Sequence, residues 1–143
     1  MIPEGKLIKS EIVIRDMALP SDVKLSRDST IRWLALSLGL ISPNESRTSL
    51  LVVLDVLIEA HKEGERLTSA EIIDRVKEKK DIDDKTVYYH LKRLQQIGLI
   101  ERKDGTYGFG DGFETNLSKI IREAYLKRIN AAMEKIDEVI RSL

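Results

Sequence analysis

The side chains best suited to chemistry cluster in one segment, DDKTVYYHLKRLQQIG, residues 83–98. If the segment is helical, five of them share one face, and that face carries no acid. Lysine and arginine bind phosphates or guanine edges, glutamine binds adenine, and tyrosine binds phosphate or stacks on a base. The face therefore predicts contact with a nucleic acid. Its residues are Lys85, Tyr89, Lys92, Arg93 and Gln96.

Three further polar residues extend this set. Thr86 lies beside the face in the first turn, and Arg102 and Lys103 follow the helix, just before an Asp-Gly pair. The stretch from Lys85 to Lys103 holds five basic residues and a single acid, Glu101. The zero net charge of the whole chain therefore conceals a locally basic stretch.

Capping residues mark the helix that carries this face. Asp83 is the expected N-cap, and the helix is expected to continue to about Ile97 and to end at Gly98. Its opposite face is apolar and should pack into a core. The residues of that inner face stand four, three and four positions apart: Val87, Leu91, Leu94 and Gly98.

The elements on either side complete a known layout. Thr68 and Glu71 are spaced as a capping box, which predicts a preceding helix at about 69–79. After the second helix, residues 99–103 and 106–109 flank Asp-Gly, a strong signal for a two-residue hairpin. Helix, turn, helix and hairpin form a winged helix-turn-helix, in which the second helix can enter the major groove. The predicted fold is therefore mainly α with a small β-hairpin wing.

An N-terminal strand and two helices are expected before this layout. Residues 7–15 partly alternate apolar and polar side chains, which predicts a strand. A helix is expected at about 28–38. The next helix should begin at a capping box of Ser42 and Glu45 and end near Lys62. That helix is apolar on nearly all sides, so it should be buried on more than one face.

A long C-terminal helix is expected from Phe113 to Leu143, because that stretch contains no proline or glycine. Its apolar residues repeat as in a heptad seam, and Ala132 and Val139 widen the stripe. The seam is short for an isolated coiled coil, so it should pack in a bundle, with a partner subunit or with the N-terminal helix. The residues expected to support a dimer are Leu126, Ile129, Met133, Ile136, Ile140 and Leu143.

Residues 67–110 resemble the broad ArsR-like group of winged-helix transcription regulators from archaea and bacteria. The resemblance is carried by TVYYHLKRLQQIGLIE, in which a recognition helix runs into Gly-Leu-Ile and the wing. Metal-sensing members use cysteine or clustered histidine ligands, which this chain lacks, so metal sensing is not implied. The resemblance implies a DNA-facing set of Lys85, Thr86, Tyr89, His90, Lys92 and Arg93.

Several functions are disfavoured by the residues present. The chain has no cysteine and only two histidines, so neither a disulfide nor a metal site is expected. No phosphate-binding loop, nucleophile elbow or H-E-x-x-H motif occurs, so neither a catalytic residue nor a cofactor is expected. The N-terminus does not resemble a signal peptide, and the apolar run at 50–58 is too short to span a membrane. A cytoplasmic protein without membrane contact is expected.

The sequence is therefore interpreted as a sequence-specific transcription regulator that binds double-stranded DNA as a homodimer. Residues 1–41 would be an N-terminal extension, 42–110 the DNA-binding domain, and 111–143 the dimerisation helix. Helix 84–97 would lie in the major groove and the wing, 99–109, on the flanking backbone. The Lys-, Glu- and Ile-rich composition resembles proteins of heat-loving microbes and fits an archaeal source.

A second hypothesis remains open at this point. Zero net charge and the unexplained first 41 residues are also compatible with a winged-helix protein-interaction module within the transcription machinery. An enzyme would require an organised polar pocket with a strongly perturbed titrating group, and the sequence gives no sign of one.

Overall fold

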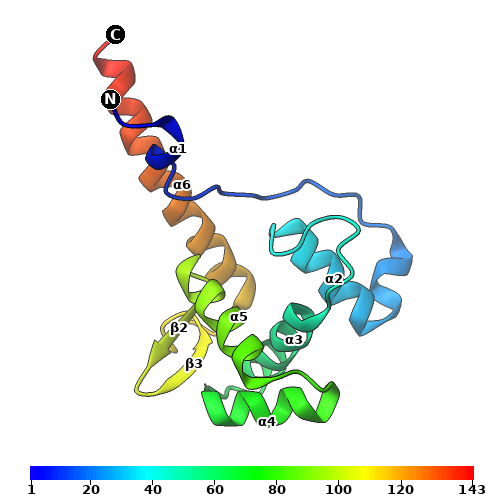
Figure 1. The fold of residues 1–143 in the computed structure, drawn as a ribbon. Coiled ribbons are helices and arrows are strands. Elements are labelled where there is room, and N and C mark those ends of the chain that lie inside the picture. Colours follow the sequence, from blue (N-terminus) through cyan, green and yellow to red (C-terminus); the bar gives the residue numbers. More distant parts are fainter. The chain divides into compact units, whose positions relative to one another are not determined.

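The computed structural model describes residues 1–143 and divides into two compact units, Met1–Asn44 and Glu45–Leu143 (Figure 1). None of its helices combines the length and the hydrophobicity that a membrane span requires. The first unit contains a short helix α1 (Glu4–Leu7), a 3-10 helix η1 (Ser21–Leu25) and helix α2 (Arg27–Ser37). The expected helix near 28–38 is thus confirmed, with Ser26 as its N-cap.

The strand expected at residues 7–15 is wrong. The chain runs from α1 into irregular backbone without a sheet partner, and alternation alone cannot satisfy the hydrogen bonds of a strand. Arg15 anchors the segment instead, because its Nη1 donates to the carbonyls of Leu36, at 2.7 Å, and Ile41, at 2.8 Å. Val13 lies against Gly39, whose φ of 71° ends α2.

The second unit is centred on helix α3 (Ser49–Lys62), which packs against α4, α5 and β3. The expected start of α3 at Ser42 is wrong. Asn44 has a φ of 64°, in the left-handed region, so a right-handed helix cannot run through it. The burial of α3 is as expected, because more than half of its residues are buried, and they include Val53, Leu54 and Val56.

The two following helices are confirmed by their caps. Helix α4 (Ser69–Lys79) begins with the predicted capping box, in which Thr68 accepts from the Glu71 N–H and the Glu71 carboxylate accepts from the Thr68 N–H. Helix α5 (Asp84–Gln96) begins at Asp83, whose carboxylate accepts from the Thr86 N–H at 2.8 Å. These caps fix the start of the helix that carries the polar face.

The predicted hairpin is confirmed as β2 (Ile100–Lys103) and β3 (Thr106–Phe109), with positive φ at both Asp104 (53°) and Gly105 (76°). A two-residue strand β1 (Leu67–Thr68), which the sequence analysis missed, pairs with β3 and gives the sheet order β1-β3-β2. The sheet and the helices α3, α4 and α5 make a winged helix-turn-helix (Figure 1).

Helix α6 (Leu117–Arg141) closes the unit and is capped by Asn116. It begins four residues later than expected from Phe113, because the Asp111 carboxylate accepts from the Phe113 and Glu114 N–H groups and holds a turn there. Ile120 and Tyr125 are buried, whereas every residue from Asn130 onward is exposed. The C-terminal part of α6 accordingly projects beyond the sheet and α5 (Figure 1).

Candidate nucleic-acid interface

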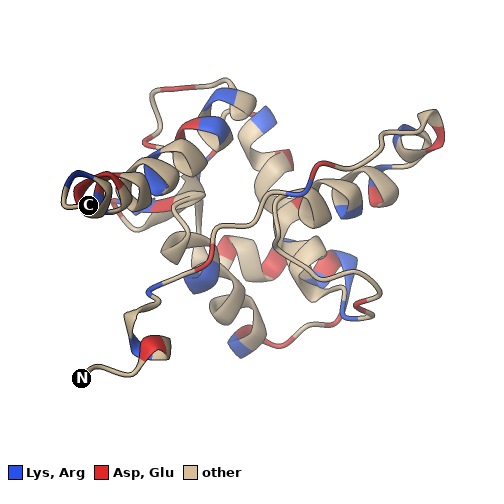
Figure 2. Ribbon diagram, turned by 90° about the horizontal axis from the view of Figure 1, so that it is seen from above, with Lys and Arg blue, Asp and Glu red and all other residues tan.

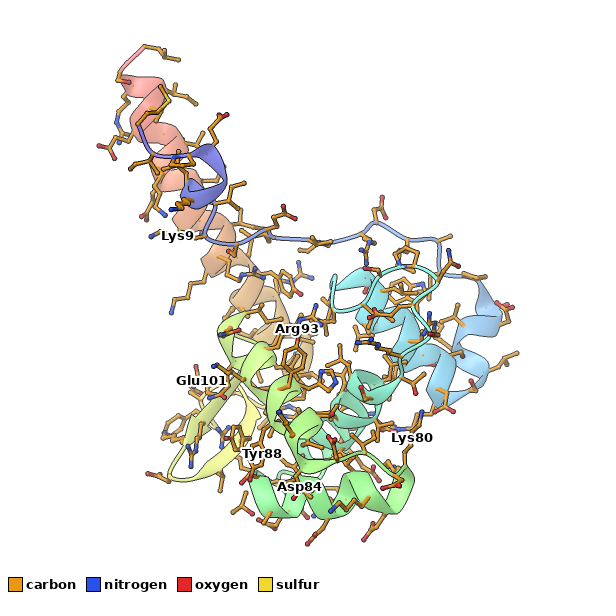
Figure 3. The ribbon with its side chains drawn as sticks, viewed as in Figure 1. Lys9, Lys80, Asp84, Tyr88, Arg93 and Glu101 are labelled. Atoms are coloured by element: carbon orange, nitrogen blue, oxygen red, sulfur yellow. The ribbon has the colours of Figure 1, made fainter.

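Helix α5 has the two faces that its sequence predicted, except that Gly98 lies beyond the helix and is exposed. Val87, Leu91 and Leu94 are buried on the inner face, and they fix the rotation of the helix about its axis. The outer face is largely open to solvent, since Lys85, Tyr89, Lys92 and Gln96 are exposed and Thr86 and Arg93 are half-buried. Figure 3 shows Asp84, Tyr88 and Arg93 in order along this helix.

The cations of this face differ from those of α4 in their partners. On α4, Lys77 pairs with Asp84 at 3.0 Å, and Lys79 lies 3.3 Å from Glu59 and 3.8 Å from Asp55. The hydrogen bond and charge of Asp84 raise the pKa of Lys77. These α4 cations are neutralised within the domain.

By contrast, Lys85, Lys92 and Arg93 make no ion pair with a carboxylate. Lysine and arginine residues occur together with acids over most of the chain, and the net charge is zero (Figure 2). The unpaired cations of α5 are therefore free to attract an anionic partner.

The wing adds Arg102 and Lys103, both exposed. The guanidinium of Arg102 lies 5.6 Å from the ring centre of Tyr107, and Lys103 Nζ lies 4.7 Å from that of Phe113. Lys103 Nζ also donates to the Asp111 carbonyl at 3.4 Å. These contacts are weak and leave both charges near the surface, where they can reach a phosphate.

His90 does not belong to the exposed face, and its expected DNA-facing orientation is wrong. The side chain is only 8% exposed and points toward α3, where Nε2 lies 2.8 Å from Ser49 Oγ. Position 90 follows the buried Val87 by three residues and therefore turns to the same side of the helix. Burial, and then the positive charge of Arg93, lower the pKa of His90, while Glu45 acts in the opposite direction.

The lowered pKa of His90 predicts a loss of stability in mild acid. The unfolded chain binds the proton with a pKa of about 6.5, more readily than the folded protein does, so stability is complete above that pH and falls below it. Urea unfolding at about pH 7.5 and about pH 5.5 should show a smaller loss in His90→Gln than in wild type. His61→Gln is the matched control. If His61→Gln and not His90→Gln removes the pH dependence, the assignment to His90 is wrong.

Residues 50–103 match the family model of a helix-turn-helix domain. The match covers nearly all of α3 together with β1, α4, α5 and β2, so it includes every element that positions the polar face. It supports a helix-turn-helix family of transcription regulators, and it does not single out the ArsR-like group that the sequence resembles. No curated protein and no solved structure matches the chain.

Two residues that support this region were not predicted from the sequence. Ser49 holds His90 from the first turn of α3, and Arg66 contacts the wing from outside the hairpin. These contacts join positions more than 30 residues apart, so no pattern in the local sequence predicts them. No group of His, Asp or Glu side chains is arranged to hold a metal ion.

Proposed function

We propose that this protein is a sequence-specific transcription regulator that binds double-stranded DNA as a homodimer. In this proposal α5 enters the major groove and the wing follows the flanking backbone. Residues 42–110 act as the DNA-binding domain, 111–143 as the dimerisation helix and 1–41 as an extension. The proposed DNA contacts are Lys85, Thr86, Tyr89, Lys92, Arg93, Gln96, Arg102 and Lys103.

The observation that carries the proposal is the outer face of α5. It combines unpaired cations, an amide and an exposed tyrosine on the second helix of a helix-turn-helix, next to a wing with two more cations. A face that is only solvated surface would be expected to carry acidic as well as basic side chains. Lys85, Tyr89, Lys92 and Gln96 follow one helical stripe, so one groove can receive all four.

The proposal of a dimer rests on α6. Its apolar seam is largely exposed in a single chain, with Leu126, Met133, Ile136, Ile140 and Leu143 all accessible to solvent. Exposed apolar side chains in a contiguous row mark interaction surfaces. A two-fold pair would present two copies of α5 to half-sites about 34 Å apart, one turn of DNA.

A protein-interaction module of the transcription machinery is the second candidate. It is favoured by the exposed apolar side chains of the first unit, which include Ile2, Leu7, Ile8 and Ile14. This candidate predicts no affinity for duplex DNA even at low salt. A measurement of DNA binding therefore distinguishes it from the transcription regulator.

Removal of the two central cations of α5 tests the proposal. A Lys92→Ala/Arg93→Ala variant is expected to weaken binding to duplex genomic DNA, and the dependence of binding on salt should become shallower by about two counterions. Fluorescence anisotropy over a salt series measures both quantities, and circular dichroism checks the fold.

The matched control is Lys6→Ala/Lys62→Ala, which removes the same charge from exposed positions outside α5 and the wing. It should bind with nearly the wild-type salt dependence. Equal losses in the two double variants would mean that net charge, and not the α5 face, drives binding. Wild-type affinity in Lys92→Ala/Arg93→Ala would contradict the assignment of α5.

A further inference from the structure

Arg66 stands one residue before β1, in a row that crosses the whole sheet. Leu67 pairs with Tyr107, so the antiparallel register places Arg66 opposite Gly108 of β3. Gly108 in turn pairs with Glu101 of β2. The side chain of Arg66 thus begins at one edge of the sheet and can reach the strand at the other edge.

The guanidinium of Arg66 donates hydrogen bonds to the backbone on both sides of the hairpin at the base of the wing, the end of the hairpin opposite its Asp104-Gly105 turn. Nη2 donates to the Glu101 carbonyl at 2.8 Å, and Nη1 donates to the Gly110 carbonyl at 3.2 Å. Glu101 lies in β2, and Gly110 directly follows β3. A planar guanidinium can serve two separate acceptors in this way, whereas an ammonium is a single compact charge.

The absence of a side chain at position 108 makes this contact possible. A Cβ atom at Gly108 would lie 2.8 Å from Arg66 Nη1 and 3.1 Å from Cζ, so the guanidinium rests directly on the glycine backbone. The Arg66 Nε is buried without a hydrogen-bond partner, which costs free energy. An apolar side chain could cover the sheet without that cost, so simple packing does not account for an arginine here.

We propose that Arg66 is the positioning residue of the wing. It holds the base of the hairpin at a fixed angle, so that Arg102 and Lys103, immediately beyond Glu101, point toward the flanking DNA backbone. This inference rests on the proposed DNA-binding function. Arg66 touches no DNA in it and acts only through the hairpin.

The test compares three substitutions, at Arg66 and Gly108, with the loss of the wing cations Arg102 and Lys103. Arg66→Met removes the hydrogen bonds, Arg66→Lys keeps the charge but cannot span both carbonyls, and Gly108→Ala displaces the guanidinium. Binding to a mixed-sequence duplex is measured by anisotropy over a salt series. Each variant should lose affinity to about the extent of Arg102→Ala/Lys103→Ala, with a salt dependence lower by about one to two counterions.

Double variants show whether Arg66 acts through the wing. Adding Arg66→Met to Arg102→Ala/Lys103→Ala should cause no further loss, since the wing no longer contributes. Adding it to Lys92→Ala should multiply the two losses, because α5 and the wing bind independently. Multiplicative losses in the first combination, or wild-type binding by Arg66→Lys, would contradict the proposal.

Amide hydrogen exchange gives a readout that needs no DNA. Arg66→Met should speed exchange in β2 and β3 while α4 keeps its wild-type protection. Unchanged exchange in the hairpin would show that Arg66 does not hold the wing. If wild type binds no duplex at any salt, the proposed function fails and the DNA role of Arg66 fails with it. Wild-type binding with an unaffected Arg66→Lys variant contradicts the role of Arg66 alone.

Discussion

Replacing Ile136 with glutamate is expected to convert the proposed homodimer into a folded monomer. Ile136 lies in the middle of the α6 seam and is 47% exposed in a single chain, so the substitution should leave Glu45–Leu143 folded. In a dimer the same carboxylate would be buried against apolar side chains without a partner, at a cost of several kcal/mol. Sedimentation equilibrium measures the change in mass.

The DNA affinity of Ile136→Glu should fall together with its mass. Two linked recognition helices bind two half-sites as one ligand, and the loss of that linkage is expected to weaken binding by roughly 10²- to 10⁴-fold. The matched control is Ala131→Glu, which places the same charge on an exposed position of α6 outside the seam. If both variants stay dimeric, α6 is not the interface. If wild type is itself a monomer, the proposal of a homodimer fails.

The parts of the fold that were predicted correctly are set by short-range interactions. Thr68 and Asp83 satisfy backbone N–H groups three residues ahead, so their effect can be derived from the local sequence. The Asp104-Gly105 turn likewise depends on two residues that accept positive φ. These signals fixed α4, α5 and the hairpin to within a residue or two.

The incorrect predictions concern segments where the local sequence pattern was not supported by the rest of the structure. Residues 7–15 alternate as a strand does, but no strand is available to pair with them. Ser42 and Glu45 are spaced as a capping box, yet Asn44 between them adopts a left-handed conformation. A capping pattern cannot prevail against a backbone conformation that excludes the helix.

For the candidate site, the sequence predicted the outer face of α5 but not what holds it in place. The 3.6-residue period of a helix predicts both that Lys92 is exposed and that Leu94 is buried. It misplaced His90, because a polar residue on the border of two faces is turned inward only by a partner such as Ser49. Arg66 depends on the register of three strands, which no local period reveals.

Leu94→Ala and Lys92→Ala together should distinguish the roles of the two faces of α5, the inner face in stability and the outer face in DNA binding. Leu94 is 0% exposed, so Leu94→Ala leaves a cavity and is expected to cost about 2–5 kcal/mol of the free energy of unfolding. The melting temperature should fall by on the order of 10 °C. Lys92→Ala, two residues away on the exposed face, should change stability by less than about 0.5 kcal/mol.

The DNA affinities of the two variants should show the opposite order. At a temperature where Leu94→Ala remains folded, its outer face is intact, and its salt dependence should equal that of wild type. Lys92→Ala should lose about one counterion from the salt dependence while it melts like wild type. A Lys92→Ala variant that loses stability but no DNA affinity would place Lys92 in a structural role. Because the two side chains are neighbours on one helix, the same pair of measurements tests both the rotation of α5 and the use of its outer face.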